Sequence, residues 1–353
     1  MVQAFAMVRV LFVSVLTFGV SMAITPVVTH ILYRYRMGKT IRDAKEAPIM
    51  HALHAKKAGT PTMGGVVVWI PVLILSLGIA FLSGADVFPN ALWDRLNFFV
   101  RSQTWLPLGA LVASAVVGLL DDYLNARGIG KHGGGLRARH RLLIFTAIAL
   151  VGAWWFYAKL DWDTLHIPFV GDWALGPWYI PVFAFILVAT AFSVNQTDGL
   201  DGLAGGALLT SFGAYGAIAL LQGREFLAAL CAAVVGGLLA FLWFNIHPAR
   251  FFMGDTGSMS LGITLGVIAM LTNQPLLLPL IGIIFVIESL SSILQMFSKR
   301  IRKKKLFLSS PLHHHLEAVG WPEPKIVMRA WVISMVAAGM GVALAVLDVL
   351  LRP

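Results

Sequence analysis

Charged residues are scarce in this sequence. Asp, Glu, Lys and Arg together make up 12% of the 353 residues, whereas soluble domains carry about 25%. This scarcity excludes a water-soluble domain. Cysteine is scarcer still, because Cys231 is the only one in the chain. An internal disulfide is therefore impossible, and the position of Cys231 inside an apolar run predicts a buried packing role.

Acidic residues are fewer than basic ones, which gives a formal net charge of +10. Such a charge is compatible with nucleic-acid binding. Here, however, the Lys and Arg residues fall in short loops between apolar segments, where anionic lipid is the nearer partner. We therefore expect no nucleic-acid function and a lipid bilayer as the surroundings.

Apolar residues make up 58% of the chain and recur in runs of about 17–25 residues, the length that spans a bilayer as a helix. The first run is too long for the core of a signal peptide, so we interpret it as a retained span. The fold class is an all-α polytopic integral membrane protein, and we treat residues 1–353 as a single domain. The ten predicted transmembrane helices are 8–33, 64–84, 106–124, 141–158, 177–194, 203–222, 225–244, 257–273, 275–298 and 327–350.

Positive charge is distributed unevenly between the two sides that ten spans imply. The loops on one side contain 21 of the 27 Lys and Arg residues, and the positive-inside rule makes that side cytoplasmic. Both termini then lie on the outer side. The loops concerned are 34–63, 121–141, 245–255 and 299–329.

Two pairs of carboxylates lie on the predicted cytoplasmic side. Asp121 and Asp122 end the third span, and two adjacent carboxylates disfavour double ionisation unless they share a cation or a proton. Asp198 and Asp201 lie in a glycine-broken helix junction that begins at Asn195, and their spacing of three places them on one side of a helical turn. A solvated helix end or a helix cap explains one such residue each, but not the whole group.

Asp255 lies between Gly254 and Gly257, directly before the eighth span. Glycine permits close approach of a phosphate, and the start of a helix supplies amide donors to an anion. A carboxylate in that setting suits a hard cation such as Mg²⁺. Helix capping is the alternative explanation for this residue taken alone.

Three consecutive histidines, His313, His314 and His315, follow a strongly basic run. Consecutive residues do not readily bind one ion together, and no cysteine ligands accompany them, so zinc is disfavoured. Imidazoles that donate hydrogen bonds to a diphosphate, or carry protons, fit the pattern better.

Taken together, these segments resemble the polyprenyl-phosphate N-acetylhexosamine 1-phosphate transferases, and within them the phospho-N-acetylmuramoyl-pentapeptide transferase branch. The triple histidine and the Gly-Thr-Pro-Thr-Met-Gly-Gly segment separate this branch from relatives that use N-acetylglucosamine donors. The motifs that carry the resemblance are Lys56-Lys-Ala-Gly-Thr-Pro-Thr-Met-Gly-Gly65, Asp121-Asp-Tyr, Asn195-Gln-Thr-Asp-Gly-Leu-Asp-Gly202, Phe252-Met-Gly-Asp-Thr-Gly-Ser258 and Pro311-Leu-His-His-His-Leu-Glu317.

The resemblance implies ten transmembrane helices, a homodimer and a Mg²⁺-dependent cleft on the cytoplasmic side of the bacterial inner membrane. It implies transfer of phospho-N-acetylmuramoyl-pentapeptide from UDP-N-acetylmuramoyl-pentapeptide to undecaprenyl phosphate, with UMP and lipid I as products. Asp255 is then the Mg²⁺ ligand, Asp121 and Asp122 handle the polyprenyl phosphate and the metal, and His314 is catalytic. The residues expected to bind substrate are Lys57, Arg141, Asn195, Asp198, Asp201, Asn245, Phe252, Gln295, His313 and His315, with Phe252 as a stacking platform for uracil.

One position departs from the family pattern, since the family typically carries lysine where this chain has Arg141. The charge is kept, but a planar guanidinium differs from an ammonium group. The sequence also leaves two mechanisms open, direct attack by the lipid phosphate and an aspartyl phospho-enzyme. We favour direct attack, because the phosphate is already mostly ionised near neutral pH.

Two other functions compete with this interpretation. A transporter or flippase would carry charges along its spans, whereas here they crowd one surface, and no tandem repeat is visible. The nearer competitor is a polyprenyl-phosphate N-acetylglucosamine 1-phosphate transferase, which differs in the nucleotide sugar consumed.

Overall fold

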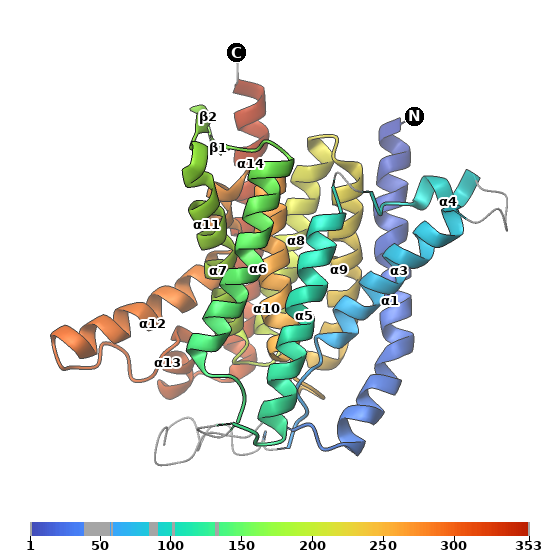
Figure 1. The fold of residues 1–353 in the computed structure, drawn as a ribbon. Helices are drawn as coiled ribbons and strands as arrows, with labels where there is room; N and C mark the ends of the chain where they lie inside the picture. The colour runs from blue at the N-terminus through green and yellow to red at the C-terminus, as the bar shows by residue number, and fades with distance from the viewer. Residues whose placement is uncertain are drawn as a thin grey trace.

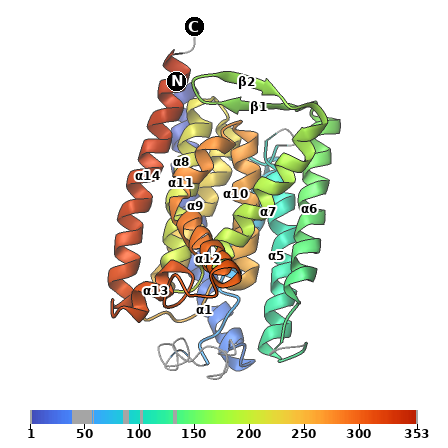
Figure 2. The ribbon, with the colours of Figure 1, turned by 90° about the vertical axis from the view of Figure 1, so that its left-hand side faces the viewer.

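The computed structural model describes residues 2–38, 57, 59–84, 91–100, 103–130 and 134–351. Within these residues the chain is a bundle of long helices with one small hairpin (Figures 1 and 2). The long helices are α1 (Val2–Arg34), α3 (Val66–Gly84), α5 (Trp105–Ala126), α6 (Ala138–Lys159), α7 (Tyr179–Thr197), α8 (Leu203–Leu221), α9 (Glu225–Asn245), α10 (Gly254–Leu271), α12 (Ile283–Ile301) and α14 (Glu323–Leu351). The short elements are α4 (Ala91–Leu96), β1 (Thr164–Ile167), β2 (Gly171–Ala174), η2 (Gly176–Trp178), η3 (Pro275–Leu277), α11 (Leu278–Ile281) and α13 (Leu312–Ala318).

The described residues contain nine helices that are long and apolar enough to cross a membrane, and a tenth if one bent pair counts as a single span. This confirms the predicted all-α polytopic membrane fold. Nine of the ten predicted spans coincide with continuous helices to within a few residues. That residues 1–353 form one domain stays a prediction.

The predicted span at 275–298 is a bent pair of helices in the structure. The chain forms a short helical segment, Pro275–Ile281, that meets α12 at an angle of 82°. Pro275 and Pro279 lack the amide hydrogen that a continuous helix needs, and Gly282 stands at the bend with φ −97° and ψ 34°. As a result α12 leans out of the bundle instead of lying along it (Figure 1).

Helix α10 is the most enclosed element, because every residue in it except Asp255 is buried. It packs mainly against α5 and α7. Its serine and threonine hydroxyls donate to backbone carbonyls four residues earlier, at 2.8 Å for Ser258 and 2.7 Å for Thr264. Polar groups in the membrane interior need such internal partners, so α10 can carry hydroxyl residues without exposing them to lipid.

A small antiparallel hairpin interrupts the all-helical pattern. Strands β1 and β2 pair with Thr164 opposite Ala174 and Ile167 opposite Gly171. The turn between them needs left-handed backbone at Phe169 (φ 65°) and Gly171 (φ 115°). The sequence analysis assigned this segment to a loop, and so missed the hairpin.

The two termini lie at the same end of the bundle as the hairpin (Figure 1). The C-terminal end of α5, with Asp121 and Asp122, lies at the opposite end together with α13 (Figure 1). We call these the terminal end and the carboxylate end. All the sequence motifs singled out above gather at the carboxylate end.

Candidate active site

The centre of the candidate site is the Arg141 guanidinium group, which lies between two carboxylates at the carboxylate end. Arg141 Nη1 lies 2.5 Å from Asp255 Oδ2 and 3.4 Å from Asp121 Oδ2. The other Asp255 oxygen accepts from Asn195 Nδ2 at 2.8 Å. The contacts therefore join α5, α6, α7 and α10, four helices that are separated along the chain.

Asp122 occupies the start of α10. Its two oxygens accept the backbone N–H groups of Asp255, at 3.1 Å, and of Thr256, at 3.0 Å. These are amide donors that a helix N-terminus leaves without helical partners. Because Asp122 from α5 accepts these hydrogens, the Asp255 carboxylate is directed to the side chains of Arg141 and Asn195. This geometry does not support capping as the explanation for Asp255.

Gly254 is required at the entry to α10. Its φ of +73° lies in the left-handed region, and a Cβ there would meet the Asp122 carboxylate, Thr62 Oγ1 and the backbone of Met63. A side chain would therefore displace Asp122 and the Thr62–Met63 segment. The adjacent backbone is fixed by hydrogen bonds from Gly64 N to Phe252 O, at 2.8 Å, and from Phe252 N to Pro61 O, at 2.8 Å. Two of the motifs found in the sequence are thus paired directly.

Asp121, Asp198 and Asn195 make further hydrogen bonds that fix the segments around this site. Asp121 accepts the backbone N–H of Leu136, which lies in the loop before α6. Asp198 Oδ2 accepts the backbone N–H of Gly254 at 3.1 Å. Asn195 also donates to Ser258 Oγ at 2.9 Å. The helix junction at 195–202 is therefore tied to the start of α10.

A second charged cluster surrounds Lys57. Its Nζ lies 2.7 Å from Asp201 Oδ1 and 2.6 Å from Glu323 Oε1. Asp201 Oδ2 also faces His247 Nδ1 at 2.9 Å and accepts from Ala249 N at 3.1 Å. Burial alone would raise the pKa of Asp201, but the hydrogen bonds and charge of Lys57 and its other donors lower it overall. Asp201 is therefore ionised at neutral pH and needs a cation nearby.

Asp201, His247 and Glu323 lie close enough together to bind a metal ion. The two carboxylates of this group need a positive charge beside them. Lys57 already supplies it, because its ammonium group contacts both Asp201 and Glu323. Lys57 also lies 5.8 Å from the ring centroid of Phe252. The predicted stacking residue and the predicted lysine are thus neighbours.

The three histidines lie on α13 and face three different partners. His313 is fully buried, and its Nδ1 is 3.0 Å from Glu288 Oε2 on α12. His314 Nδ1 is 2.9 Å from Glu317 Oε2. His315 Nδ1 accepts from Leu308 N at 3.3 Å. Each Nδ1 atom therefore has a partner of its own among the described residues.

His313 has an unusual environment. Its Nε2 is buried and has no hydrogen-bond partner among the described residues. The ring packs directly on Gly199, where any side chain would collide with it. Glu288 fixes the ring through Nδ1, and it also accepts the His313 backbone N–H at 3.2 Å. The ring is therefore held by Glu288 on one side and by Gly199 on the other.

Two residues predicted to bind substrate have side chains that hydrogen-bond to the backbone of nearby segments. Asn245 accepts from Gly202 N at 2.9 Å and donates to Phe251 O at 2.8 Å. Gln295 accepts from Leu306 N at 2.9 Å and donates to Phe307 O at 3.0 Å. Both are buried and brace loops around the site. A direct contact between either residue and substrate stays a prediction.

The sequence analysis missed Glu288, Glu323 and His247. Each pairs with a motif residue across a long stretch of chain, as Glu323 does with Lys57 over 266 positions. Glu288 offered one signal, because it is an acidic residue inside a predicted span, where carboxylates are costly unless paired. His247 lies in the 245–255 loop between two motif residues, and its proximity to Asn245 was the only indication.

Comparison with known proteins identifies the family. The model for glycosyl transferase family 4 matches residues 104–273, and signature 1 of phospho-N-acetylmuramoyl-pentapeptide-transferase matches residues 57–67. A phospho-N-acetylmuramoyl-pentapeptide-transferase of Chloroflexus aggregans is 37% identical, over 97% of this chain and 90% of its own. The enzyme of Listeria welshimeri is 39% identical, over 95% of this chain and 99% of its own. The enzyme of Desulfosudis oleivorans is 37% identical, over 95% of this chain and 92% of its own.

The chain belongs to the phospho-N-acetylmuramoyl-pentapeptide-transferase family. Identity at this level over nearly the whole length of each relative confirms the resemblance drawn from the motifs. The signature region includes Lys57 and the Gly64–Gly65 pair, which contact the second charged cluster and the Phe252 segment respectively. The matched family region, 104–273, contains Asp121, Asp255 and Arg141. The protein is therefore a membrane-embedded transferase enzyme.

Proposed function

We propose that the chain transfers phospho-N-acetylmuramoyl-pentapeptide from UDP-N-acetylmuramoyl-pentapeptide to undecaprenyl phosphate, which releases UMP and forms lipid I. The observation that carries this proposal is the meeting of Asp121, Asp122 and Asp255 with Arg141 at one end of a membrane bundle. Both substrates are anionic at the reacting phosphates. Their approach therefore needs positive charge and acidic residues that can bind a cation.

The residues around Asp255 fit Mg²⁺. Asp255, Asp121 and Asp122 would bind it, because carboxylate oxygens are the hard ligands that this ion prefers. When bound, the ion neutralises charge on the diphosphate oxygens of the donor. Arg141 adds a second positive charge beside the same carboxylates. Its Nε is buried and has no hydrogen-bond partner among the described residues. This N–H group is therefore available to an acceptor on the bound substrate.

We place the uridine part of the donor at the second charged cluster. Phe252 offers an aromatic face and Lys57 a cation beside it. Asp201 and Glu323 fix the Lys57 ammonium, and Asp198 ties the junction to the start of α10. Base stacking on one aromatic ring contributes about 1–3 kcal/mol.

We propose direct attack by the lipid phosphate. The Asp122 oxygens already accept two amide hydrogens, and those of Asp255 accept from Arg141 and Asn195. Carboxylates engaged in this way are poorer nucleophiles than a phosphate that is mostly ionised near neutral pH. Glu288 orients His313, and His314 lies next to it, so we propose that the imidazoles of α13 donate hydrogen bonds to the diphosphate.

We further propose that the carboxylate end faces the cytoplasm and both termini face the outside. The uneven Lys and Arg distribution supports this orientation. Cysteines introduced singly at positions in 299–311, in a variant with Cys231→Ala, should react with a membrane-impermeant thiol reagent only after the cells are opened. Labelling of these positions in intact cells would contradict the orientation. We also expect a homodimer, as the family resemblance implies.

The test of function is a donor assay. Purified protein in detergent, given UDP-N-acetylmuramoyl-pentapeptide, undecaprenyl phosphate and Mg²⁺, should release UMP and form a lipid product. UDP-N-acetylglucosamine in the same assay should give none. Release of UMP only from the N-acetylglucosamine donor would replace the proposal with the neighbouring transferase class. Absence of UMP from both donors would remove the enzymatic assignment altogether.

A further inference from the structure

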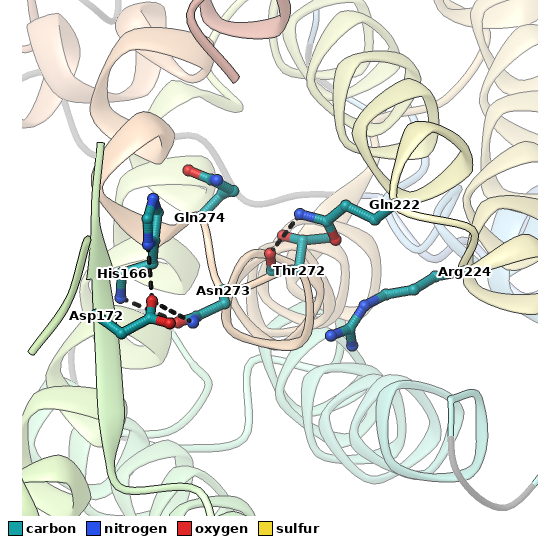
Figure 3. A pocket seen from close by; sticks show the side chains of 7 residues that line it. All are labelled: His166, Asp172, Gln222, Arg224, Thr272, Asn273 and Gln274. Carbon is teal, nitrogen blue, oxygen red and sulfur yellow. Dashed lines mark hydrogen bonds and ion pairs between the residues drawn. The ribbon is translucent and has the colours of Figure 1, made fainter. Parts of the chain in front are cut away.

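The terminal end of the bundle contains a polar pocket far from the residues assigned to catalysis. It has a volume of about 190 Å³. Pockets for drug-sized ligands measure about 300–1,000 Å³, so this one suits a much smaller molecule. It lies over the end of α10 (Figure 3), and its lining residues are His166, Asp172, Gln222, Arg224, Thr272, Asn273 and Gln274.

One side of the pocket is cationic. Arg224 pairs with no carboxylate in the part of the chain that the structure describes, and its guanidinium lies 5.4 Å from the Trp162 ring centroid. Burial lowers the pKa of Arg224. Stacking on a ring leaves the N–H edge of the guanidinium available to an anion.

The other side accepts hydrogens. Asp172 lies across the pocket from Arg224 (Figure 3), with its side chain 54% exposed. The Gln274 side chain is 2% exposed, and its Oε1 has no hydrogen-bond partner among the described residues. This oxygen is closed off from the pocket, so the acceptor that faces the open volume is the Asp172 carboxylate.

The walls are fixed by contacts that do not fill the pocket. His166 is buried, and its Nδ1 lies 2.7 Å from Asp172 Oδ1 while its Nε2 lies 2.8 Å from Asp348 Oδ2. Gln222 Nε2 donates to Thr272 O at 2.8 Å. The pocket is thus preorganised by the β1–β2 hairpin, the turn between α8 and α9, and the end of α10.

We propose that this pocket binds a small zwitterion, a molecule with a primary ammonium group and a phosphate or carboxylate group. The acidic group lies on Arg224, and the ammonium group lies against Asp172. An ethanolamine phospholipid headgroup and a free amino acid share this chemistry. Arg224 also lies near the carbonyl end of α10, where a cation is favourable, but that role does not explain the open polar volume between Arg224 and Asp172.

The experiment uses the full chain in detergent and four probes, measured by ligand-observed NMR titration and by thermal stability. Glycerophosphoethanolamine and alanine are the zwitterions, and inorganic phosphate and ethanolamine are the two half-ligands. We expect saturable binding of at least one zwitterion, at least about tenfold tighter than either half-ligand. Binding of glycerophosphoethanolamine alone identifies a lipid headgroup, and binding of alanine alone identifies a free amino acid.

Three variants test the residues. Arg224→Gln and Asp172→Asn should each weaken zwitterion binding about tenfold or more, since each removes a charged hydrogen-bond partner. Lys159→Gln is the matched control, because Lys159 also stacks on a tryptophan, Trp154 at 5.6 Å, but lines no part of the pocket. Thermal stability without ligand checks the folding of each variant, and Asp172→Asn serves if Arg224→Gln is unstable.

Failure of both zwitterions to bind the wild-type protein would overturn the proposal. Equal weakening in Lys159→Gln would overturn it too, because binding would then be unrelated to the pocket. Phosphate that binds as tightly as the zwitterions, and that Asp172→Asn leaves unaffected, would show an anion site instead.

Discussion

Each end of the bundle has a titratable side chain between two carboxylates. At the carboxylate end Arg141 lies between Asp255 and Asp121, and the Arg141 and Asp255 side chains are 27% and 19% exposed. At the terminal end His166 lies between Asp172 and Asp348, and the His166 and Asp348 side chains are 2% and 1% exposed.

The difference separates an accessible site around Arg141 from a buried contact between His166 and Asp348 that fixes structure. The His166 ring nitrogens each face a carboxylate oxygen, one from Asp172 and one from Asp348. The contact joins the hairpin to α14, and Phe169 N also donates to Asp348 at 2.6 Å. At the carboxylate end, by contrast, one guanidinium serves a cluster of three carboxylates. That cluster retains negative charge for a further cation.

The largest predicted effect is at Asp255. Asp255→Asn keeps the size of the side chain but removes a negative hard ligand. Turnover should fall by a factor on the order of 10³ or more, which corresponds to several kcal/mol of lost electrostatic stabilisation. UMP release measured across a Mg²⁺ titration checks this, with thermal stability as the control for folding.

The next effect is on stability and lies at the terminal end. Asp348→Asn removes one partner of the buried His166 pair and should cost about 3 kcal/mol of folding free energy. The midpoint of thermal unfolding in detergent should fall by several degrees. Asp163→Asn, at a partly buried aspartate of the same end with no ion pair among the described contacts, is the matched control. An equal fall in both variants would show that the His166 contact adds no particular stability.

The sequence predicts local features of the two ends better than contacts between residues that are far apart along the chain. Hydropathy predicts nine helices, because spanning length and apolar composition are local properties. At 275–298 hydropathy finds the apolar run but not the bend at Pro279 and Gly282, because it does not distinguish a bent span from a straight one. Asp121, Asp255 and Lys57 were found through motifs and resemblance, whereas the His166–Asp348 pair, 182 positions apart, had no motif to reveal it.

A smaller effect is expected for the nucleotide. Phe252→Ala should weaken uridine binding by about 1–3 kcal/mol while changing the chemical step less, because a stacking platform binds the substrate and its transition state about equally. Affinity for UMP, measured by calorimetry, checks this. Phe251→Leu, at the adjacent buried ring, is the control for packing. Unchanged UMP affinity in Phe252→Ala would remove this residue from the site.

The smallest effect is expected at Arg141. Arg141→Lys keeps the charge but loses the planar group that contacts Asp255 and Asp121 together. Turnover should fall about tenfold or less in Arg141→Lys and considerably further in Arg141→Gln. Equal turnover in the Lys and Gln variants would show that the charge at this position is not used.

The most direct test of the account measures Asp255→Asn and Asp348→Asn side by side, for UMP release per folded molecule and for the thermal midpoint. The account predicts opposite outcomes. Asp255→Asn should lose nearly all turnover at an unchanged midpoint, and Asp348→Asn should keep its turnover at a lowered midpoint. A folded Asp255→Asn variant that retains more than about a tenth of wild-type turnover, a difference of only about 1.4 kcal/mol, would contradict the assignment of catalysis to the carboxylate end.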